Sequence, residues 1–201
     1  MRILIATQNP GKFTEISNSL KSNQGLKVIG IPENKADIIV EETGRTYMEN
    51  SLIKAKAFYQ NDVDFSLADD AGIEIPVIQN LLGVKTRRFG AGEKATDQEW
   101  LDYFLNYFQK FKGEQRVAYF KTFLCLYKPD QIQYFEGILK GRLAEQQMCE
   151  ITPGIPLSSV FIPEGFDVSL SQMSIQEKNN ISHRGLALKK LNDYLKKGLY
   201  E

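Results

Sequence analysis

The amino-acid sequence predicts one α/β domain, a mixed β-sheet with flanking helices, and three observations lead to this. The chain has 201 residues, of which 42% are hydrophobic, and a chain of this length buries roughly 70% of its unfolded surface on folding. Apolar, β-branched segments alternate with amphipathic ones in the order βαβαβ, then αββ, then α. No repeat or linker composition divides the chain, so residues 1–201 are expected to form a single domain.

The N-terminal residues predict a strand, a helix and a second strand. The segment RILIAT (residues 2–7) is apolar and β-branched, which indicates a buried strand. Asn9 is a favoured N-cap and Pro10 suits the first helical position, so a helix is expected over residues 10–20. Residues 28–31 predict a short second strand.

Capping signals in the middle of the chain predict two further helices. Thr46 and Glu49 have the spacing of a capping box, which opens a helix to about residue 59. Thr96 or Asp97 can cap another helix. The apolar faces expected for these helices are Met48, Leu52, Ala55 and Tyr59 in the first, and Trp100, Leu101, Phe104 and Phe108 in the second.

Apolar segments predict the remaining strands. Residues 65–75 read as two strand segments interrupted by an Asp-Asp-Ala-Gly sequence. Residues 116–127 and 132–140 read as a hairpin, and residues 161–162 as a further short strand. These strands complete the expected sheet.

Composition excludes several classes of protein. Lys and Arg number 25 and Asp and Glu number 25, whereas sequence-independent binding of nucleic acid needs clustered excess cations. Cys125 and Cys149 form no disulfide framework and lack metal-finger spacing, which favours a reducing cytosol. No segment approaches the roughly 18 apolar residues of a membrane span. We therefore expect a cytoplasmic protein without nucleic-acid or membrane partners.

The turn between the first strand and the first helix has the features of an anion site. Free N–H groups at a helix N-terminus attract anions, and a lysine in the first turn opposes the helix dipole unless an anion binds. The alternative is an ordinary Asn-capped turn with a solvated lysine. The residues of this candidate phosphate site are Thr7, Gln8, Asn9, Pro10, Gly11 and Lys12.

A second helix start repeats this pattern near the C-terminus. Ser182 can cap a last helix over residues 183–197, with Gly198 as its C-cap. Cationic groups again lie at the unfavourable end of the dipole, which predicts a second anion contact. The alternative for the histidine is a satisfied core or surface residue. The cationic groups are Lys178, His183 and Arg184.

Two acidic pairs are candidates for a metal site. Asp69 and Asp70 lie in an otherwise apolar stretch, where adjacent carboxylates are costly unless a cation neutralises them. Mg²⁺ prefers one or two carboxylates together with substrate phosphates. The alternatives are an Asp-rich turn closed by Gly72 and, for Glu41 and Glu42, a solvated loop.

Together these segments resemble the inosine triphosphate pyrophosphatase family, which hydrolyses deaminated purine nucleoside triphosphates. The resemblance covers nearly the whole chain, and several ordered motifs at matching spacings are more specific than any one of them. The motifs are Thr7-x-Asn9-x-x-Lys12; Glu41-Glu42-Thr43-Gly44 with Thr46-Tyr47-x-Glu49-Asn50 and Lys54-Ala55; Leu67-Ala68-Asp69-Asp70-x-Gly72; Gly83-Val84 with Arg88-Phe89; Phe135-x-Gly137 with Gly141; and Lys178-x-x-Ile181-Ser182-His183-Arg184.

The resemblance implies a fold and a mechanism. The expected fold is an elongated mixed sheet with two lobes around a central cleft, paired as a homodimer. The expected reaction is Mg²⁺-dependent release of pyrophosphate from a nucleoside triphosphate, with Asp70, Lys12 and Asp69 as the catalytic residues. Glu41 and Asp70 would hold Mg²⁺, with Glu42 replacing Glu41 if the loop register differs. The other substrate contacts would be Thr7 to Gly11, Lys54, Ala71, Lys178, His183 and Arg184.

One segment departs from the family pattern. The family carries Phe-Gly-Tyr-Asp-Pro where this chain has Ile155-Pro156-Leu157-Ser158-Ser159, and Thr86-Arg87 replaces the small residues usual before Arg88. An apolar Ile155 offers no π-face for a purine. We therefore predict a weaker preference for inosine and xanthosine triphosphates over ordinary ones. Two alternatives stay open: a pyrophosphatase for modified or pyrimidine nucleotides, and a non-catalytic nucleotide-binding homologue.

Overall fold

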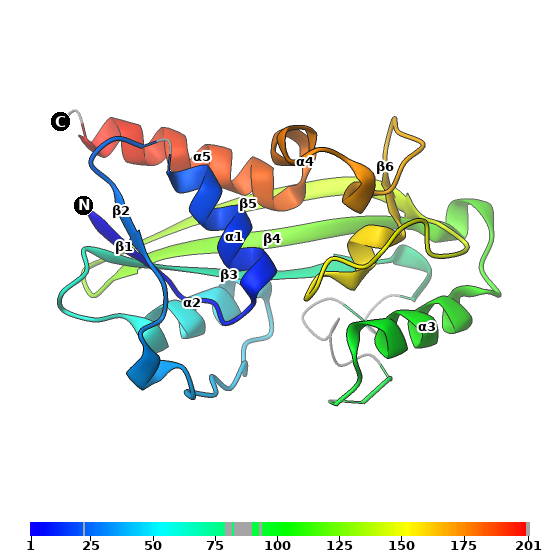
Figure 1. Cartoon of the computed structure of the whole chain (residues 1–201), viewed down its shortest axis with the longest axis horizontal. Helices are drawn as coiled ribbons and strands as arrows, with labels where there is room; N and C mark the ends of the chain where they lie inside the picture. Colours follow the sequence, from blue (N-terminus) through cyan, green and yellow to red (C-terminus); the bar gives the residue numbers. More distant parts are fainter. Residues whose placement is uncertain (22, 79–81, 83–89, 93, 200–201) are drawn as a thin grey trace.

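The computed structural model describes all residues except 22, 79–81, 83–89, 93 and 200–201. Within this part of the chain, six strands form one sheet in the order β2-β1-β3-β4-β5-β6. Three long strands run along the molecule and give it an elongated shape (Figure 1). The strands are β1 (Arg2–Ile5), β2 (Lys27–Ile29), β3 (Phe65–Glu74), β4 (Val117–Lys128), β5 (Gln131–Leu143) and β6 (Phe161–Pro163).

The sheet is mixed, as the order of elements predicts. Strand β1 pairs in parallel with β2 and β3, whereas β3, β4, β5 and β6 pair antiparallel. The parallel pairing of β1 with β3 ends at Ile5 and Leu67, and β3 then continues without this neighbour. The carboxyl end of a parallel strand is where open α/β sheets place their ligands.

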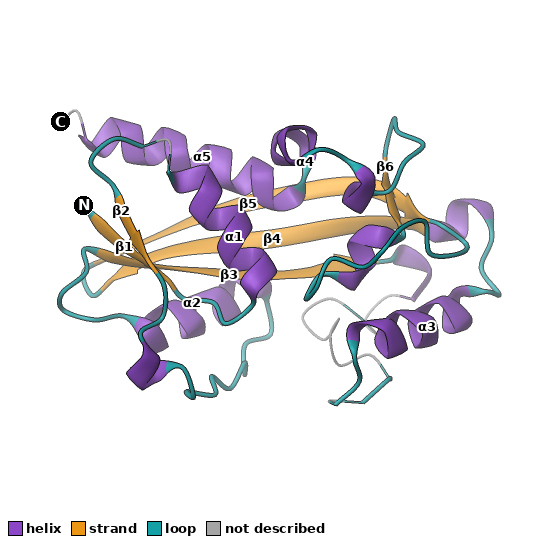
Figure 2. Cartoon of the chain, viewed as in Figure 1, coloured by secondary structure: helices purple, strands orange, loops and turns teal. Residues whose placement is uncertain are grey.

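Helices cover both faces of the sheet (Figure 2). Helices α1 and α5 pack with one face of β1, β3, β4 and β5, and α2 packs with the opposite face. Helix α3 lies at the other end of the long strands (Figure 1). The helices are α1 (Pro10–Leu20), α2 (Tyr47–Phe58), α3 (Asp97–Phe108), α4 (Ile175–Ile181) and α5 (His183–Leu199). None of the described helices is long and apolar enough to cross a membrane.

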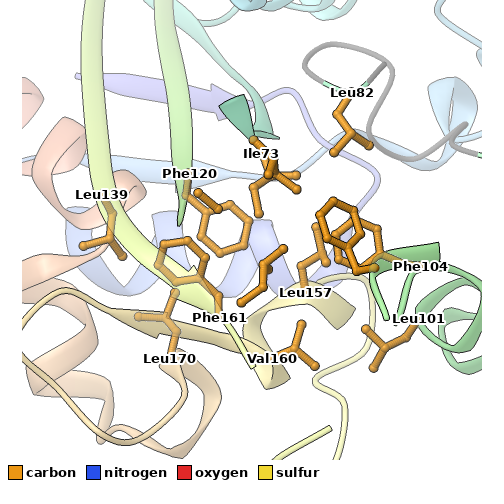
Figure 3. Close-up of a cluster of buried hydrophobic side chains, with 14 of the residues drawn as sticks. Ile73, Leu82, Leu101, Phe104, Phe120, Leu139, Leu157, Val160, Phe161 and Leu170 are labelled. Atoms are coloured by element: carbon orange, nitrogen blue, oxygen red, sulfur yellow. The ribbon is translucent and has the colours of Figure 1, made fainter. Parts of the chain in front are cut away.

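Three clusters of buried side chains form the hydrophobic core. Two of them lie on opposite faces of the sheet at β1. The third lies between α3 and the far ends of β3, β4 and β5. Figure 3 shows that third cluster, where Phe120 and Phe161 pack beside Leu157. Their ring centroids are 4.3 Å apart. The two ends of the sheet therefore carry separate cores, joined by the long strands.

Local signals predicted most element boundaries correctly. Helix α1 has the predicted bounds, and the Asn9 side chain accepts a hydrogen bond from the Lys12 N–H. Helix α3 begins after Thr96, whose side chain and that of Glu99 form a complete capping box. The predicted hairpin is present as β4 and β5. Strand β1 is shorter than predicted, and β2 begins one residue earlier, at Lys27.

Several expectations were wrong. Strand β3 is continuous through Asp69 and Asp70, because β4 pairs with it along its whole length. Met48 is 40% exposed, since Tyr47, Ser51, Ala55 and Phe58 form the buried face of α2 instead. Gly198 lies within α5 rather than ending it. The short helix α4 before Ser182 was not predicted. The motif Gly83-Val84 with Arg88-Phe89, and the Thr86-Arg87 departure, lie outside the described residues.

Candidate active site

A cavity of about 550 Å³ opens where β1 ends and β3 continues. One part of its lining is linked by ion pairs and is called the charged end, and another part belongs to the hydrophobic cluster packed against α3 and is called the apolar end. The charged end contains Lys12, Glu15, Glu42, Lys54, Asp69, Asp70 and Arg184. The apolar end contains Trp100, Phe120, Ile155, Pro156, Leu157 and Leu170. Among the residues predicted as site residues, Thr7, Gln8, Asn9, Ala71, Lys178 and His183 also line the cavity.

Strand alternation places the two aspartates on opposite faces of the sheet. Asp69 shares its face with Leu67, which packs in the cluster of α1 and α5. Asp70 shares its face with Ala68, which packs in the cluster of α2. Both side chains reach the cavity because β1 no longer covers this edge of β3. Each carboxylate therefore meets cations from a different helix.

Asp69 is held ionised by buried cations. Its Oδ2 lies 2.6 Å from Lys12 Nζ and 3.4 Å from Arg184 Nη2, and Thr122 Oγ1 donates to its Oδ1. Burial alone would raise the pKa of Asp69, but Arg184 and Lys12 outweigh it and hold that pKa well below its usual range. Burial in turn lowers the pKa of Lys12, although Asp69 opposes the change. Asp69 is therefore a fixed negative charge.

Asp70 differs in both pairing and pKa. Lys54 Nζ donates to Asp70 Oδ1 at 2.7 Å and to Glu42 Oε1 at 3.0 Å. The other oxygen, Asp70 Oδ2, is buried and has no hydrogen-bond partner among the described residues. Burial raises the pKa of Asp70 against the opposing effect of Lys54. The raised pKa and the free oxygen make Asp70 the more basic carboxylate of the pair.

The acidic loop presents Glu42 rather than Glu41. Glu42 contacts Lys54 and lines the cavity, whereas Glu41 is exposed and lies outside the lining residues. The Gln8 side-chain amide donates to the carbonyls of Ala36 (2.7 Å) and Ile38 (3.0 Å), which ties this loop to the turn after β1. The geometry thus favours the alternative that the sequence left open, and Gln8 serves to position the loop.

The turn after β1 is built by local hydrogen bonds. Thr7 Oγ1 accepts the N–H of Asn9 at 3.2 Å, and Asn9 Oδ1 accepts the N–H of Lys12 at 3.1 Å. Pro10 and Gly11 lie outside the cavity lining. A Cβ on Gly11 would lie 3.1 Å from the Pro153 carbonyl oxygen, so this helix start packs closely against the loop before Ile155. Pro10 and Gly11 therefore shape the turn.

A glycine on β5 allows α5 to deliver its first residues to the cavity. A Cβ on Gly137 would lie 1.8 Å from the His183 carbonyl oxygen, so only glycine permits this approach. Ser182 Oγ accepts the N–H of Gly185 at 2.9 Å, as expected of an N-cap. Arg184 Nη1 donates to Glu15, which holds the guanidinium beside Asp69. Arg184 is thus committed to internal ion pairs.

His183 lies on the apolar side of the same turn. Its ring stacks on Phe120 with centroids 4.9 Å apart and an interplanar angle of 20°. Burial, and then the neighbouring Arg184, hold the pKa of His183 well below its usual value. Its Nδ1 has no partner in the described part of the chain. The imidazole is therefore neutral and combines an aromatic face with an unused polar atom.

The loop that departs from the family pattern bridges the two ends of the cavity. Asn9 Nδ2 donates to the Gly154 carbonyl at 3.1 Å, and the Gly154 N–H donates to Asp97 Oδ2 at 2.6 Å. Gly154 has a φ of +81°, which suits glycine. The loop thus connects the turn before α1 with the start of α3, and it places Ile155 in the cavity.

Sequence reasoning missed Glu15, Trp100 and Phe120, which line this cavity, and Thr122, which contacts the cavity residue Asp69. Glu15 and Thr122 contact Arg184 and Asp69 directly. Trp100 and Phe120 line the apolar end, but their helix and strand patterns identify them only as core residues. Glu15 could have been found, because it lies three residues after Lys12 and so on the same side of α1. The sequence carries no comparable signal for Thr122.

The carboxylates fit a divalent cation. Glu42 and Asp70 supply oxygen donors, and the buried Asp70 Oδ2 is unpartnered. Among the described residues, no group of three or more His, Cys, Asp or Glu side chains could hold a metal by itself. Two carboxylates that leave the remaining positions to water and phosphate are the usual arrangement for Mg²⁺.

Comparison with known proteins agrees with the fold. The chain belongs to the Ham1 family, whose sequence model matches residues 3–194. A dITP/XTP pyrophosphatase of Caldanaerobacter subterraneus subsp. tengcongensis is 35% identical over 203 residues, 100% of this chain and 99% of the relative. A Ham1 protein from Coxiella burnetii has a TM-score of 0.82 at 28% identity, covering 98% and 99% of the two chains. The Staphylococcus aureus Ham1 protein has a TM-score of 0.81 at 29% identity, covering 98% and 100%.

These comparisons confirm two predictions from the sequence. The resemblance to the pyrophosphatase family is confirmed, because the family model and relatives of full length both match. The mixed α/β fold is also confirmed by the two solved structures. The roles of the individual site residues stay predictions.

Proposed function

We propose that this protein hydrolyses nucleoside triphosphates to the nucleoside monophosphate and pyrophosphate. The observation that carries the proposal is the carboxylate pair on β3, which is met by Lys12 from α1 and Lys54 from α2 beside an apolar cavity end. The names of the relatives, dITP/XTP pyrophosphatases, support the same activity. The polyphosphate would occupy the charged end and the base the apolar end.

The geometry supports an in-line displacement. A water oxygen forms a bond to the α-phosphorus, the bond to the bridging oxygen breaks, and pyrophosphate leaves with that electron pair. Asp70 Oδ2 is buried without a partner among the described residues, so this carboxylate could orient the attacking water and accept its proton. Lys12 and Lys54 would neutralise the phosphates, and Asp69 would hold Lys12 and Arg184 in place.

Mg²⁺ would complete this site, held by Asp70 and Glu42. The cation would supply charge neutralisation for the leaving pyrophosphate. Lys54 bridges the same two carboxylates and therefore keeps the site electrically balanced.

We also propose that the enzyme is cytoplasmic and homodimeric, as the family resemblance implies. Light scattering of the purified protein would test the dimer.

A shifted base specificity is a second candidate. Ile155 and Leu157 line the apolar end without an aromatic face, and Ser158 supplies a hydroxyl where the family has a carboxylate. This supports activity on ordinary nucleotides as well as on inosine and xanthosine triphosphates. A non-catalytic role is less consistent with the site, because a simple binder has no use for a basic buried carboxylate.

One experiment separates these candidates. Pyrophosphate release is measured on a panel of purine and pyrimidine triphosphates, with and without Mg²⁺. The proposal expects Mg²⁺-dependent release on at least the oxo-purine triphosphates. Release restricted to those substrates would exclude the shifted specificity, and no release from any nucleotide would overturn the enzymatic proposal.

A further inference from the structure

We propose that Lys54 occupies the Mg²⁺ position while the protein is free, so that the metal binds only when the lysine moves away. This inference rests on the proposed function. Lys54 Nζ lies 3.0 Å from Glu42 Oε1 and 2.7 Å from Asp70 Oδ1, and these are the two carboxylates that would hold the metal. The lysine is thus an internal substitute for the cation.

The ammonium is a substitute in both charge and position. The Lys54 side chain is 13% exposed, and those of Glu42 and Asp70 are 30% and 9% exposed. Neighbouring carboxylates at this depth repel each other unless a cation lies between them. An ammonium carries three donors and no acceptor, so it can donate to both carboxylates at once. Lys54 therefore meets the same electrostatic need that Mg²⁺ would meet.

The carboxylates are held in place by groups other than Lys54. Asp70 is part of the hydrogen-bonded ladder between β3 and β4. The loop that carries Glu42 is bound to α2, because Asn50 Oδ1 accepts the N–H of Gly44 at 2.8 Å. Helix α2 in turn packs against β3. The two carboxylates therefore stay close together when the lysine leaves them.

Lys54 and Mg²⁺ cannot share this position. Mg²⁺ takes carboxylate oxygens at about 2.1 Å in near-octahedral geometry, and an ammonium between the same oxygens excludes it by space and by charge. The lysine can move, because it lines the cavity together with Glu42 and Asp70 and its stem is flexible. Metal binding is therefore an exchange of cations.

This exchange couples the metal to the substrate. In the free protein, the departing ammonium loses two charge-assisted hydrogen bonds, which weakens metal binding. The phosphates of a nucleoside triphosphate in the charged end offer new oxygen acceptors to Lys54, which offset this loss. Because such coupling is reciprocal, Mg²⁺ and the nucleotide each strengthen the binding of the other.

Amine labelling of the wild-type protein tests the exchange directly. Lys54 should react slowly in metal-free protein and about 10-fold faster with saturating Mg²⁺, when its hydrogen bonds are broken. It should react slowly again when Mg²⁺ and an α,β-imido analogue of inosine triphosphate are both present. Mass spectrometry of the labelled peptides measures the rates. Lys56, which is exposed on the same helix and lies outside the cavity lining, should react equally in all three conditions.

Metal binding gives a second readout that needs no turnover. Mn²⁺, a spectroscopic substitute for Mg²⁺, should bind metal-free Lys54→Met about 10-fold more tightly than wild type, since only wild type has to break the hydrogen bonds of the lysine. Lys56→Met removes the same charge from the same helix and should bind Mn²⁺ as wild type does.

Two results would overturn the exchange. One is labelling of Lys54 that does not respond to Mg²⁺, and the other is equal Mn²⁺ affinity in wild type and a folded Lys54→Met. The labelling needs no variant, so it decides the question even where Lys54→Met does not fold. Pyrophosphate release by the wild-type protein tests the proposed function separately.

Discussion

The two ends of the cavity satisfy their polar groups in opposite ways. At the charged end, Asp69 and Asp70 each contact cations from a helix on their own face of the sheet. At the apolar end, Trp100 Nε1 and His183 Nδ1 have no partner in the described protein. The net charges of the charged end are therefore paired without a ligand, although Asp70 Oδ2 keeps no partner, whereas the unpartnered groups of the apolar end are neutral.

The difference follows from the cost of burying each kind of group. An unpaired buried ion is far more costly than an unpaired neutral N–H, so the lysines must be partnered before any phosphate arrives. A single unsatisfied indole or imidazole nitrogen is tolerable in the free protein. Charged groups are thus paired in advance, whereas neutral groups can stay unpartnered.

The substitution expected to have the largest effect on the charged end is Asp70→Asn. The amide keeps the shape of the carboxylate but cannot accept the proton of the attacking water, so kcat should fall about 10³-fold. Affinity for the nucleoside monophosphate should change little. Steady-state pyrophosphate release and monophosphate binding measure the two effects. Asp130→Asn, in the exposed turn after β4, is the control, and equal rates in the two variants would remove the catalytic role of Asp70.

Asp69→Asn should instead reduce stability. The change leaves Lys12 and Arg184 buried beside a neutral group, and removing one partner of a buried ion pair costs about 3 kcal/mol or more. Denaturant unfolding measures this loss. Glu74→Gln is the control on the same strand, because its pair with Lys121 is half-exposed and is worth at most about 1 kcal/mol. Similar losses in both variants would show that Asp69 does not anchor the charged end.

Local chemistry made the helix starts predictable. Asn9, Thr96 and Ser182 cap their helices through hydrogen bonds within four residues, so the information lies in neighbouring positions. Strand β3 was predicted as two segments because the evidence for its continuity lies in residues that are distant in the sequence. Two adjacent aspartates indicate a turn until β4 pairs with them and cations from α1, α2 and α5 neutralise them.

The partners of the site residues depend on contacts between distant parts of the chain. Glu15 meets Arg184 only because Gly137 lets α5 lie against β5. Trp100 belongs to an ordinary apolar helix face, and nothing local shows that it borders a cavity. The family resemblance identified motifs before and after these residues in the sequence. It gave no information on which side chains contact the site residues.

The prediction with the smallest expected effect tests whether His183 stays uncharged in the folded protein. The pKa of His183 lies well below that of an unfolded histidine, so as pH falls below about 6.5 the unfolded chain takes up a proton that the folded chain does not. Stability is then lost toward acid pH, by about 2 kcal/mol between pH 7 and pH 5 if the folded imidazole stays neutral. His183 is the single histidine of the chain, so His183→Gln should remove this part of the slope. Denaturant unfolding of both proteins at several pH values measures the difference, and parallel curves would mean that His183 is protonated as easily in the fold as in water.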